Sequence, residues 1–472
     1  MKMTKYKLGE LIEVTRGASL SGQFYAEEGK LIRLTLGNFN MDGGGFKENT
    51  SKTDLYFTGT VRDEFILNKG DIITPLTEQS LGLLGTTARI PESGKYIQSQ
   101  DVALVRCKEG LLDPNFCYYL ISSSIVRQQL SAAAQQTKIR HTSPEKIKNC
   151  TVWVPDFEVQ KNIGRILTDI DNKIAINRQI NDNLEAMAKQ LYDYWFVQFD
   201  FPNEEDKPYK SSGGAMVWNE KLKREIPQGW HCYELNKWLE IKSGFAFKSE
   251  TYISKGKFKV VTIKNVQDHH LDTSSCDYVY EIPQGMKKWC SLSVNDRLIS
   301  LTGNCGRLCI VTEKDLLLNQ RVGLLACNDE YIDYAYLLLS SEEYQTLSNN
   351  LAKGAAQANL SPVELCKNIA VLPKLDVLEK FNRQIKPIVA SYIQNEIQIA
   401  ELTKQRDELL PLLMNGQASV NYHLSAKVYP LPIAYKKAMP IVANQTISNI
   451  FNQKSDSHTP SPCLQTSQIR CS

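Results

Sequence analysis

The stretch VWVPDFEVQKNIGRILTDIDNKIAIN, residues 152–177, has a counterpart in AVLPKLDVLEKFNRQIKPIVASYIQN, residues 370–395. Each begins with a short apolar run that ends in a proline, and the two prolines, Pro155 and Pro373, lie 218 positions apart. After each proline, apolar residues recur every seven positions, with a second row four positions later. This pattern is typical of a long helix that packs along another helix. The two stretches therefore predict two long, equivalent helices.

Each predicted helix has a seam of two rows. The rows are Ile163, Ile170, Asn177, Leu184 and Leu191 beside Leu167, Ile174, Asn181, Ala188 and Trp195 in the first helix, and Phe381, Ile388, Asn395, Leu402 and Leu409 beside Ile385, Tyr392, Ile399, Arg406 and Leu413 in the second. Because equivalent helices of one chain can pair antiparallel, we expect Asn177 and Asn395 to lie opposite each other and to fix the register as a buried polar layer. The alternative is that each helix packs only on its own domain. Pro387 is expected to kink the second helix or delay its start.

The repetition extends over most of the chain. Near the start, Tyr6, Leu8, Glu13 and Gly17 match Tyr233, Leu235, Glu240 and Gly244, each pair 227 positions apart. The offset then falls in small steps, reaching 218 where Ser143-Pro144 matches Ser361-Pro362. Two copies of one fold that differ by loop insertions and deletions produce such a series. Each copy begins with short apolar runs typical of strands and continues with a helix-like stretch.

These patterns predict an α+β fold: two repeated α/β domains joined by two long antiparallel coiled-coil helices. The segment between the copies contains Pro202, Pro208 and a Ser-Ser-Gly-Gly run, which predicts an exposed linker. The end of the chain is rich in Ser, Gln, Asn and Pro, and is expected to be poorly ordered. The expected boundaries are 1–155 for the first domain, 156–198 for the first long helix, 199–225 for the linker, 226–373 for the second domain, 374–416 for the second long helix and 417–472 for the tail.

Composition restricts the class of protein. The chain has 472 residues, a net charge of +3 and 12 cysteines. Scattered cysteines without a framework favour a reducing cytoplasm, and Cys305 and Cys309, the closest pair, are expected to be buried apolar residues rather than zinc ligands. No apolar run is long enough for a membrane helix. The near-neutral charge does not by itself indicate nucleic acid.

Several catalytic motifs are absent from the sequence. It has no phosphate-binding loop, no Asn/Asp-Pro-Pro-aromatic tetrapeptide of amino-methyltransferases, no dinucleotide fingerprint and no serine-hydrolase elbow. Its six histidines show no metal-ligand spacing, and His269-His270 is expected to lie in a polar loop. We therefore expect no catalytic site in this chain and no cofactor or metal bound to it.

The arrangement resembles the DNA specificity subunit of type I restriction-modification enzymes, over roughly residues 5–420. Its more specific local features are IPQGW at 226–230, YKSSGGAMV at 209–217 and GAAQANLS at 354–361. The resemblance implies that each domain is a target-recognition domain that reads one half of a bipartite double-stranded DNA target, while the helices set the spacing. It also implies two modification (methyltransferase) subunits with S-adenosylmethionine on the helices, restriction (motor-nuclease) subunits that use ATP and Mg²⁺, a cytoplasmic location, and adenine-N6 methylation by the whole complex.

Two sets of residues are candidates for DNA contact, because phosphate contact needs cations free of carboxylates and base reading needs Arg, Lys, Asn or Gln. The first set lies in segments 114–144 and 344–363, which contain no Asp or Glu. It consists of Arg127, Gln135, Gln136, Lys138 and Arg140, with Lys353, Gln357 and Asn359 in the second copy. The second set consists of Thr77, Gln79 and Arg89, with Thr302, Asn304 and Arg307. The alternative is that the amide-rich segments only cap the strands that follow them.

Two other functions remain open from the residues alone. One is a two-headed coiled-coil adaptor that binds proteins and not DNA. The other is an enzyme with an unfamiliar active site, against which the missing motifs argue. If the candidates are right, Arg140→Ala and Lys138→Ala weaken DNA binding and flatten its salt dependence.

Overall fold

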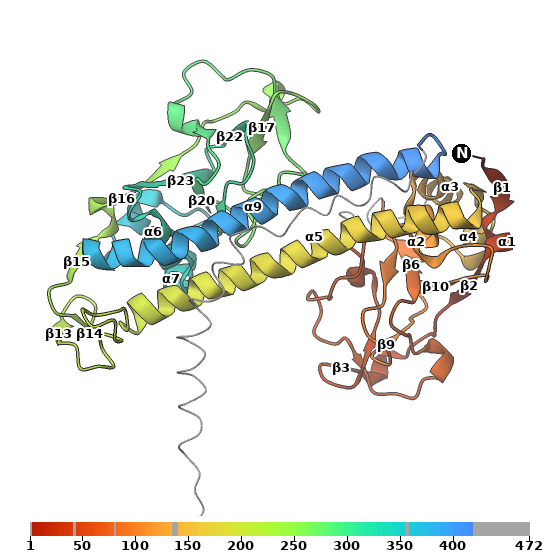
Figure 1. The fold of residues 1–472 in the computed structure, drawn as a ribbon, viewed down its shortest axis with the longest axis horizontal. Helices are drawn as coiled ribbons and strands as arrows, with labels where there is room; N and C mark the ends of the chain where they lie inside the picture. Colours follow the sequence, from red (N-terminus) through yellow and green to blue (C-terminus); the bar gives the residue numbers. More distant parts are fainter. Residues whose placement is uncertain (1, 41–43, 80–81, 135–139, 355–357, 419–472) are drawn as a thin grey trace, which may run out of the picture. The chain divides into compact units, whose positions relative to one another are not determined.

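The fold is described by a computed structural model that covers residues 2–40, 44–79, 82–134, 140–354 and 358–418 (Figure 1). The chain divides into two compact units, unit 1 with Met1–Gln179 and Gln398–Leu424, and unit 2 with Ile180–Ile397 and Ser425–Ser472. The division falls inside both long helices, α5 (Phe157–Tyr192) and α9 (Leu375–Met414). Each unit therefore contains a segment of both helices.

Unit 1 is built around a four-stranded antiparallel sheet with the order β2-β10-β6-β8. A smaller sheet has the order β3-β5-β4-β9, and β1 pairs with β12. The strands are β1 (Thr4–Lys7), β2 (Ile12–Arg16), β3 (Tyr25–Ala26), β4 (Leu31–Arg33), β5 (Tyr56–Phe57), β6 (Ile72–Pro75), β7 (Thr77–Glu78), β8 (Ala88–Arg89), β9 (Tyr96–Ile97), β10 (Val102–Cys107), β11 (Arg140–His141) and β12 (Thr151–Val154). The short helices are α1 (Leu8–Leu11), α2 (Pro114–Ser122), α3 (Ser124–Ala133) and α4 (Pro144–Lys148).

Unit 2 repeats this plan. Its main sheet has the order β16-β23-β20-β21, and β15 pairs with β24. The strands are β13 (Met216–Asn219), β14 (Arg224–Pro227), β15 (His231–Glu234), β16 (Leu239–Ser243), β17 (Phe258–Val261), β18 (Asp277–Val279), β19 (Ser291–Leu292), β20 (Arg297–Ser300), β21 (Leu308–Ile310), β22 (Leu316–Leu318), β23 (Val322–Cys327) and β24 (Ile369–Leu372). The short helices are α6 (Ile332–Ser340), α7 (Glu342–Leu351) and α8 (Pro362–Cys366).

The internal repeat expected from the sequence is confirmed. The first residues of β2 and β16 lie 227 positions apart, those of β10 and β23 lie 220 apart, and those of α2 and α6 lie 218 apart. The small sheets also correspond, because each contains a parallel pair, β4 with β9 or β17 with β22, whose first strand pairs antiparallel with a further strand, β5 or β18. The two small sheets differ in their outer strands, and unit 2 has in addition the β13–β14 hairpin.

The matched Ser-Pro dipeptides begin equivalent helices. Ser143 Oγ accepts a hydrogen bond from the amide of Lys146 at the start of α4, at 3.2 Å, and Ser361 Oγ accepts one from Glu364 at the start of α8, at 3.3 Å. The proline that follows each serine takes the first helical position, where its missing amide proton costs no hydrogen bond. The sequence match therefore marks a helix cap and not a binding motif.

Both long helices belong to the core of each unit. In unit 1, Ile163 and Leu167 of α5 and Leu413 of α9 join the cluster beneath the main sheet. In unit 2, Trp195 follows the last turn of α5 and packs on Phe381 of α9, with ring centroids 5.6 Å apart. Large buried aromatic rings contribute strongly to such a core. Each domain is therefore stabilised by segments of both helices.

The predicted pairing of Asn177 with Asn395 is wrong by one helical turn. The amide of Asn395 donates to Asn181 Oδ1 at 3.0 Å, and the amide of Asn177 donates to Gln398 Oε1 at 2.9 Å. Asn181 and Asn395 are 4% and 6% exposed, whereas Asn177 is only half-buried. The helices do run antiparallel, because Arg406 bonds Asp171 at 3.1 Å, so that residue numbers fall along α9 as they rise along α5. The row containing Asn181 faces inward most fully, and the polar layer forms there.

The predicted exposed linker is instead a folded part of unit 2. Phe201 is buried and stacks between Tyr209 and Trp230, with ring centroids at 4.7 and 4.9 Å. The carboxylate of Asp200 accepts bonds from the amide and hydroxyl of Ser211 at 2.7 and 2.6 Å. Aromatic residues hidden among the turn formers supply this small core. Pro387 does not delay α9, which is helical from Leu375, and the predicted tail after Ala418 lies outside the described residues.

Candidate nucleic-acid interface

The structure brings the two candidate segments of each copy together. In unit 1, β7 pairs with β11, placing Arg140 opposite Glu78 and His141 opposite Thr77. In unit 2, Thr302 bridges to Asn359, with the Gly303 amide bonded to the Ala358 carbonyl at 2.9 Å. Thr77 and Thr302 occupy matched positions, as do His141 and Asn359, 218 positions apart. The two predicted sets therefore form one equivalent feature in each domain.

The Arg140 guanidinium forms an ion pair with the buried carboxylate of Glu78. Its Nη1 lies 3.0 Å from Glu78 Oε1, and the Glu78 side chain is 2% exposed. The other oxygen, Oε2, accepts the backbone amides of Gly82, Leu83 and Leu84 at 3.1, 2.9 and 3.0 Å. The expectation that Arg140 is free of carboxylates is therefore wrong, because Glu78 reaches it from a segment 62 positions earlier. Glu78 therefore joins Arg140 to the backbone at residues 82–84.

Two other unit 1 candidates, Arg127 and Arg89, are also held by contacts within the fold. Arg127 donates to the Gly82 carbonyl, and the Arg89 guanidinium lies over the Tyr118 ring at 4.8 Å. Gln79 is exposed at the end of β7. Gln135, Gln136 and Lys138 lie outside the described residues. A hollow of about 380 Å³ beside this loop is lined by Glu78, Gly82, Leu84, Ser122, Ser124, Arg127, Gln128 and Ser131.

The unit 2 candidates divide into paired and exposed residues. Arg307 Nε lies 3.2 Å from Asp268 Oδ1, and its Nη1 donates to Gln267 Oε1 at 3.1 Å, with the amide of Asn304 beside the same guanidinium. Lys353 and Asn359 are exposed and bridge to each other through their backbones. Gln357 lies outside the described residues. Lys353 and Asn359 are therefore the described candidates best presented to a ligand in this domain.

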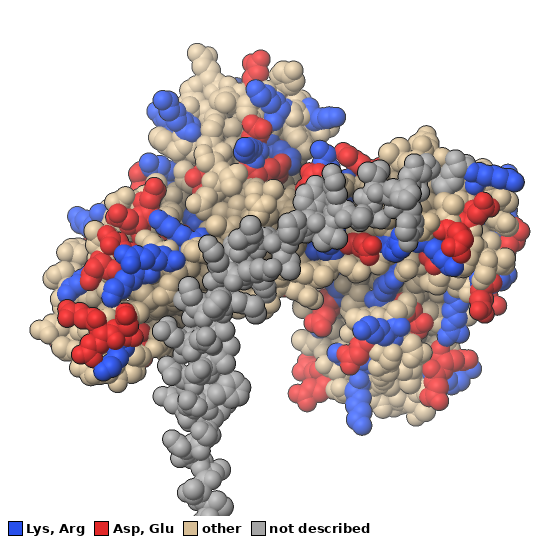
Figure 2. Space-filling view, viewed as in Figure 1, with Lys and Arg blue, Asp and Glu red and all other residues tan. Residues whose placement is uncertain are grey.

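Charge is mixed on the face drawn in Figure 2, where Lys and Arg alternate with Asp and Glu and no broad patch of one sign is visible. This matches the small net charge of +3. Among the described residues, no group of three His, Cys, Asp or Glu is placed to hold a metal ion. No described helix has the length and apolarity needed to cross a bilayer. Cys305 and Cys309 are buried, as expected for apolar packing residues.

A contact that the sequence did not predict ties a loop of the second domain to α9. The Tyr392 hydroxyl donates to the His269 carbonyl at 2.7 Å, and His270 Nδ1 lies 3.2 Å from Glu396 Oε2. His269 Nδ1 lies 3.3 Å from the Tyr336 hydroxyl of α6. Tyr392 and Glu396 stand four positions apart on one helix face, a spacing that could have indicated a shared contact. The loop that carries His269 and His270 is therefore held against α9 and α6 by polar contacts.

The same region holds a carboxyl group with a raised pKa. Burial, together with the neighbouring carboxylates Asp182 and Glu396, raises the pKa of Glu185 to about 7, against smaller opposing effects of His270 and Tyr392. The folded state therefore binds a proton that the unfolded state releases near its ordinary pKa of 4.5. Stability is consequently expected to fall as pH rises from about 4.5 to about 7.

Glu185→Gln is expected to remove this pH dependence and to stabilise unit 2 at pH 8 by about 1–2 kcal/mol, after allowance for solvent screening. Urea unfolding followed by tryptophan fluorescence checks it, because five of the six tryptophans lie in unit 2. Equal urea midpoints for the variant and the native chain at pH 8, with the native pH dependence retained, would contradict the assignment.

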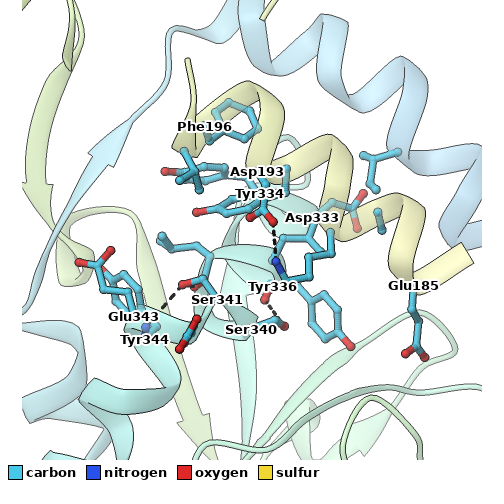
Figure 3. Close-up of a pocket in the computed structure, with 18 of the residues that line it drawn as sticks. Glu185, Asp193, Phe196, Asp333, Tyr334, Tyr336, Ser340, Ser341, Glu343 and Tyr344 are labelled. Atoms are coloured by element: carbon cyan, nitrogen blue, oxygen red, sulfur yellow. Dashed lines mark hydrogen bonds and ion pairs between the residues drawn. The ribbon is translucent and has the colours of Figure 1, made fainter. Parts of the chain in front are cut away.

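A second hollow lies wholly within unit 2 and has a volume of about 720 Å³. Figure 3 shows Tyr334, Tyr336 and Asp333 near its centre and Glu185, Asp193 and Glu343 around them. Its walls come mainly from α5, α6, α7, α9 and β24, with a few residues from elsewhere, such as Arg224 of β14 and Ile310 of β21. They include five tyrosines: Tyr192, Tyr334, Tyr336, Tyr344 and Tyr392. We call this hollow the tyrosine groove. The sequence alone gave no signal for it, because its residues come from elements that lie far apart along the chain.

These features define a class of protein: a tandem-repeat chain with two equivalent α+β domains, each packed on two antiparallel helices, with two polar segments joined at the same place in each domain. The chain belongs to the family described as the type I restriction modification DNA specificity domain, whose model matches residues 1–186 and 227–406. The two matches coincide with the two copies of the repeat.

Similar proteins agree with this assignment. The chain is 26% identical over 323 residues to the specificity subunit of the type I restriction enzyme MjaIX of Methanocaldococcus jannaschii, covering 66% of this chain and 71% of the relative. It is 27% identical over 383 residues to the MjaVIII specificity subunit of the same organism, covering 77% and 83%. A crystal structure of a type I restriction-modification S subunit from M. genitalium matches with a TM-score of 0.55 and 17% identity, covering 88% of this chain and 96% of that chain. That likeness supports the fold.

Proposed function

We propose that this chain is the DNA-sequence specificity subunit of a type I restriction-modification complex, with one domain for each half of a bipartite target. The observation that carries the proposal is that the DNA specificity family model matches the chain twice, once for each structural copy. Two equivalent target-recognition domains on one chain suit a DNA target with two half-sites. Catalysis belongs to other subunits in this proposal, and the adaptor without DNA binding is not favoured.

The partners follow from the same proposal. Two equivalent domains offer two equivalent places for modification subunits, which would bring S-adenosylmethionine to the DNA. Restriction subunits that use ATP and Mg²⁺ would complete the complex, and this chain would bind none of these cofactors itself. The complex would act in the cytoplasm, where its double-stranded DNA substrate lies. We further propose that the antiparallel helix pair, with its register set at Asn181 and Asn395, holds the two readers at a defined spacing.

The test is to co-express the chain with a candidate modification subunit and to sequence the host genome for N6-methyladenine. A bipartite methylated motif, two short specific sequences separated by a fixed gap, is the expected result. A control strain carries the modification subunit alone. Methylation at a single continuous motif would contradict the assignment of one domain to each half-site. Absence of methylation, together with no retention of DNA by the assembled complex, would favour the adaptor.

Lys353→Ala in the assembled complex is expected to weaken DNA binding for all sequences alike and to reduce the salt slope by about one, because a phosphate contact releases one counterion. Fluorescence anisotropy on a target duplex over a salt series measures both quantities. Lys52→Ala, an exposed lysine outside the joined segments, is the matched control. An unchanged slope for Lys353→Ala would remove this residue from the interface.

A further inference from the structure

The loop at residues 266–271, between β17 and β18, holds the guanidinium of Arg307. Asp268 Oδ1 lies 3.2 Å from Arg307 Nε, and Gln267 Oε1 accepts a hydrogen bond from Arg307 Nη1 at 3.1 Å. Both terminal nitrogens face the amide of Asn304, whose oxygen, in the orientation that satisfies both groups, accepts from Nη1 and Nη2 at 3.2 and 3.3 Å. The loop therefore fixes the plane of the guanidinium, and its end is turned toward an exposed acceptor.

This ion pair differs from that of Arg140 in the first domain. The side chains of Asp268 and Arg307 are 71% and 29% exposed, whereas that of Glu78 is 2% exposed. The pair therefore lies at the surface, where a ligand can replace the Asn304 amide. A carboxylate so close to the guanidinium repels a phosphate group but not the neutral edge of a base. The end of an arginine guanidinium matches two neighbouring acceptors, O6 and N7 of guanine.

The same loop is anchored to α9. The Tyr392 hydroxyl donates to the His269 carbonyl, and His270 pairs with Glu396. Glu396 Oε1 also accepts a hydrogen bond at 2.6 Å from Asn181, which belongs to the polar layer of the helix pair. His269 has a φ of +62°, a left-handed conformation that a residue with a side chain keeps only where its surroundings hold it. The position of the loop is therefore set by α9 as well as by its own domain.

The first domain has an equivalent loop without this histidine. The amide of Gly45 donates to the Thr87 carbonyl at 2.9 Å, and the amide of His269 donates to the Leu308 carbonyl at the same distance. Thr87 and Leu308 lie 221 positions apart, the offset of this part of the repeat. Gly45 thus takes the place of His269, and its φ of +99° is also left-handed.

The other side chains of this arrangement are also missing from the first copy. The residues at the positions of Asp268, Arg307, Tyr392 and Glu396 are Gly44, Thr86, Ile174 and Arg178. The first domain forms the same main sheet and helices without them, so the fold does not require the arrangement. Two copies of one fold distinguish different half-sites only through residues in which they differ. The arrangement therefore suits base recognition by the second domain.

We propose that Arg307 contacts a guanine in the half-site of the second domain, and that Asp268 and the loop anchored by Tyr392 position it. O6 and N7 of the guanine replace the Asn304 amide at the end of the guanidinium. Asp268 and Tyr392 are positioning residues, because they act through Arg307. The inference rests on the proposed function, since it requires that the second domain binds DNA.

Methylation of a duplex library of varied sequence, by the chain assembled with a candidate modification subunit, measures the base preference at each position. Arg307→Lys keeps the charge but loses the planar pair of donors. The preference for guanine at one position of one half-site should fall by roughly tenfold or more, while the other half-site keeps its preference. An unchanged preference overturns the proposal, as does a loss spread evenly over all sequences, which indicates a phosphate contact.

Asp268→Asn tests the positioning carboxylate. The guanine preference at the same position should fall, while binding to unrelated duplexes stays equal or tightens, because a negative charge is removed beside the DNA. The matched control is Asp277→Asn, a change at an exposed aspartate of β18, which should keep the native preference. A native preference in Asp268→Asn overturns the positioning role.

Tyr392→Phe removes the hydroxyl that anchors the loop. It should speed hydrogen exchange at residues 266–271 and lower the guanine preference in the native chain, but have no further effect on that preference in the Arg307→Lys chain. Additive effects of the two changes overturn the link through Arg307. A native complex that methylates a bipartite motif unaffected by Arg307→Lys overturns this inference alone. A native complex that neither methylates nor retains DNA overturns the proposed function and this inference together.

Discussion

Arg297→Ala is expected to destabilise unit 2 by about 3–5 kcal/mol, because it leaves a buried carboxylate without its cation. Arg297 is 1% exposed, and its Nη2 lies 2.5 Å from Oδ1 of Asp333, which is 4% exposed as a residue. Its Nη1 donates to Asn295 Oδ1 at 2.8 Å, and its guanidinium lies 5.6 Å from the Tyr336 ring. Removal of the Arg297 side chain leaves the Asp333 carboxylate without its cation and also opens a cavity.

The repeat supplies the matched control. The positions equivalent to Arg297 and Asp333 in the first copy are Ile72 and Asn115. Arg297→Ile combined with Asp333→Asn transfers the first copy's pair into the second and should recover most of the lost stability, because no buried charge remains. Urea unfolding followed by tryptophan fluorescence measures each variant. A double variant as unstable as Arg297→Ala would show that the charge pair is not the cause.

Arg140→Ala is expected to destabilise unit 1 by about 3 kcal/mol, since it leaves the buried Glu78 carboxylate with amide donors only. The β7–β11 pairing and the loop at residues 82–84 should loosen, and DNA binding by the assembled complex should fall. The salt slope should nevertheless stay at its native value, because Arg140 neutralises Glu78 and not a phosphate.

This result would differ from the expectation drawn from the sequence, in which Arg140 contacts phosphate directly. Hydrogen exchange in β7 and the salt series of DNA binding separate the two roles. Glu78→Gln is the matched control, since it removes the ion pair from the other side and should loosen the same loop. A flattened salt slope for Arg140→Ala, with β7 exchange unchanged, would restore the direct phosphate role.

Two hydrogen-bonded pairs join α5 to α9: Asn181 with Asn395, and Asn177 with Gln398. They show what the heptad pattern could not predict. The heptad rows predicted both helices, and Asn177, Asn181 and Asn395 all fall on predicted seam positions. The pattern does not say which of the two asparagines of α5 meets Asn395, because they lie one turn apart on adjoining rows. Packing of α5 on its domains turns the row of Asn181 inward, and this packing involves residues far away in the sequence.

The sequence by itself determined the repeat, its shrinking offsets and the two long helices, since these depend on periodicity and on the order of residues along the chain. The tertiary structure alone decided the register at Asn181, the folding of the segment around Phe201, the burial of Glu78 against Arg140 and the formation of the tyrosine groove. Each of these joins side chains from separate elements. Local sequence does not predict which elements pack against each other. Burial and electrostatic pairing depend on distance in space and not on distance along the chain.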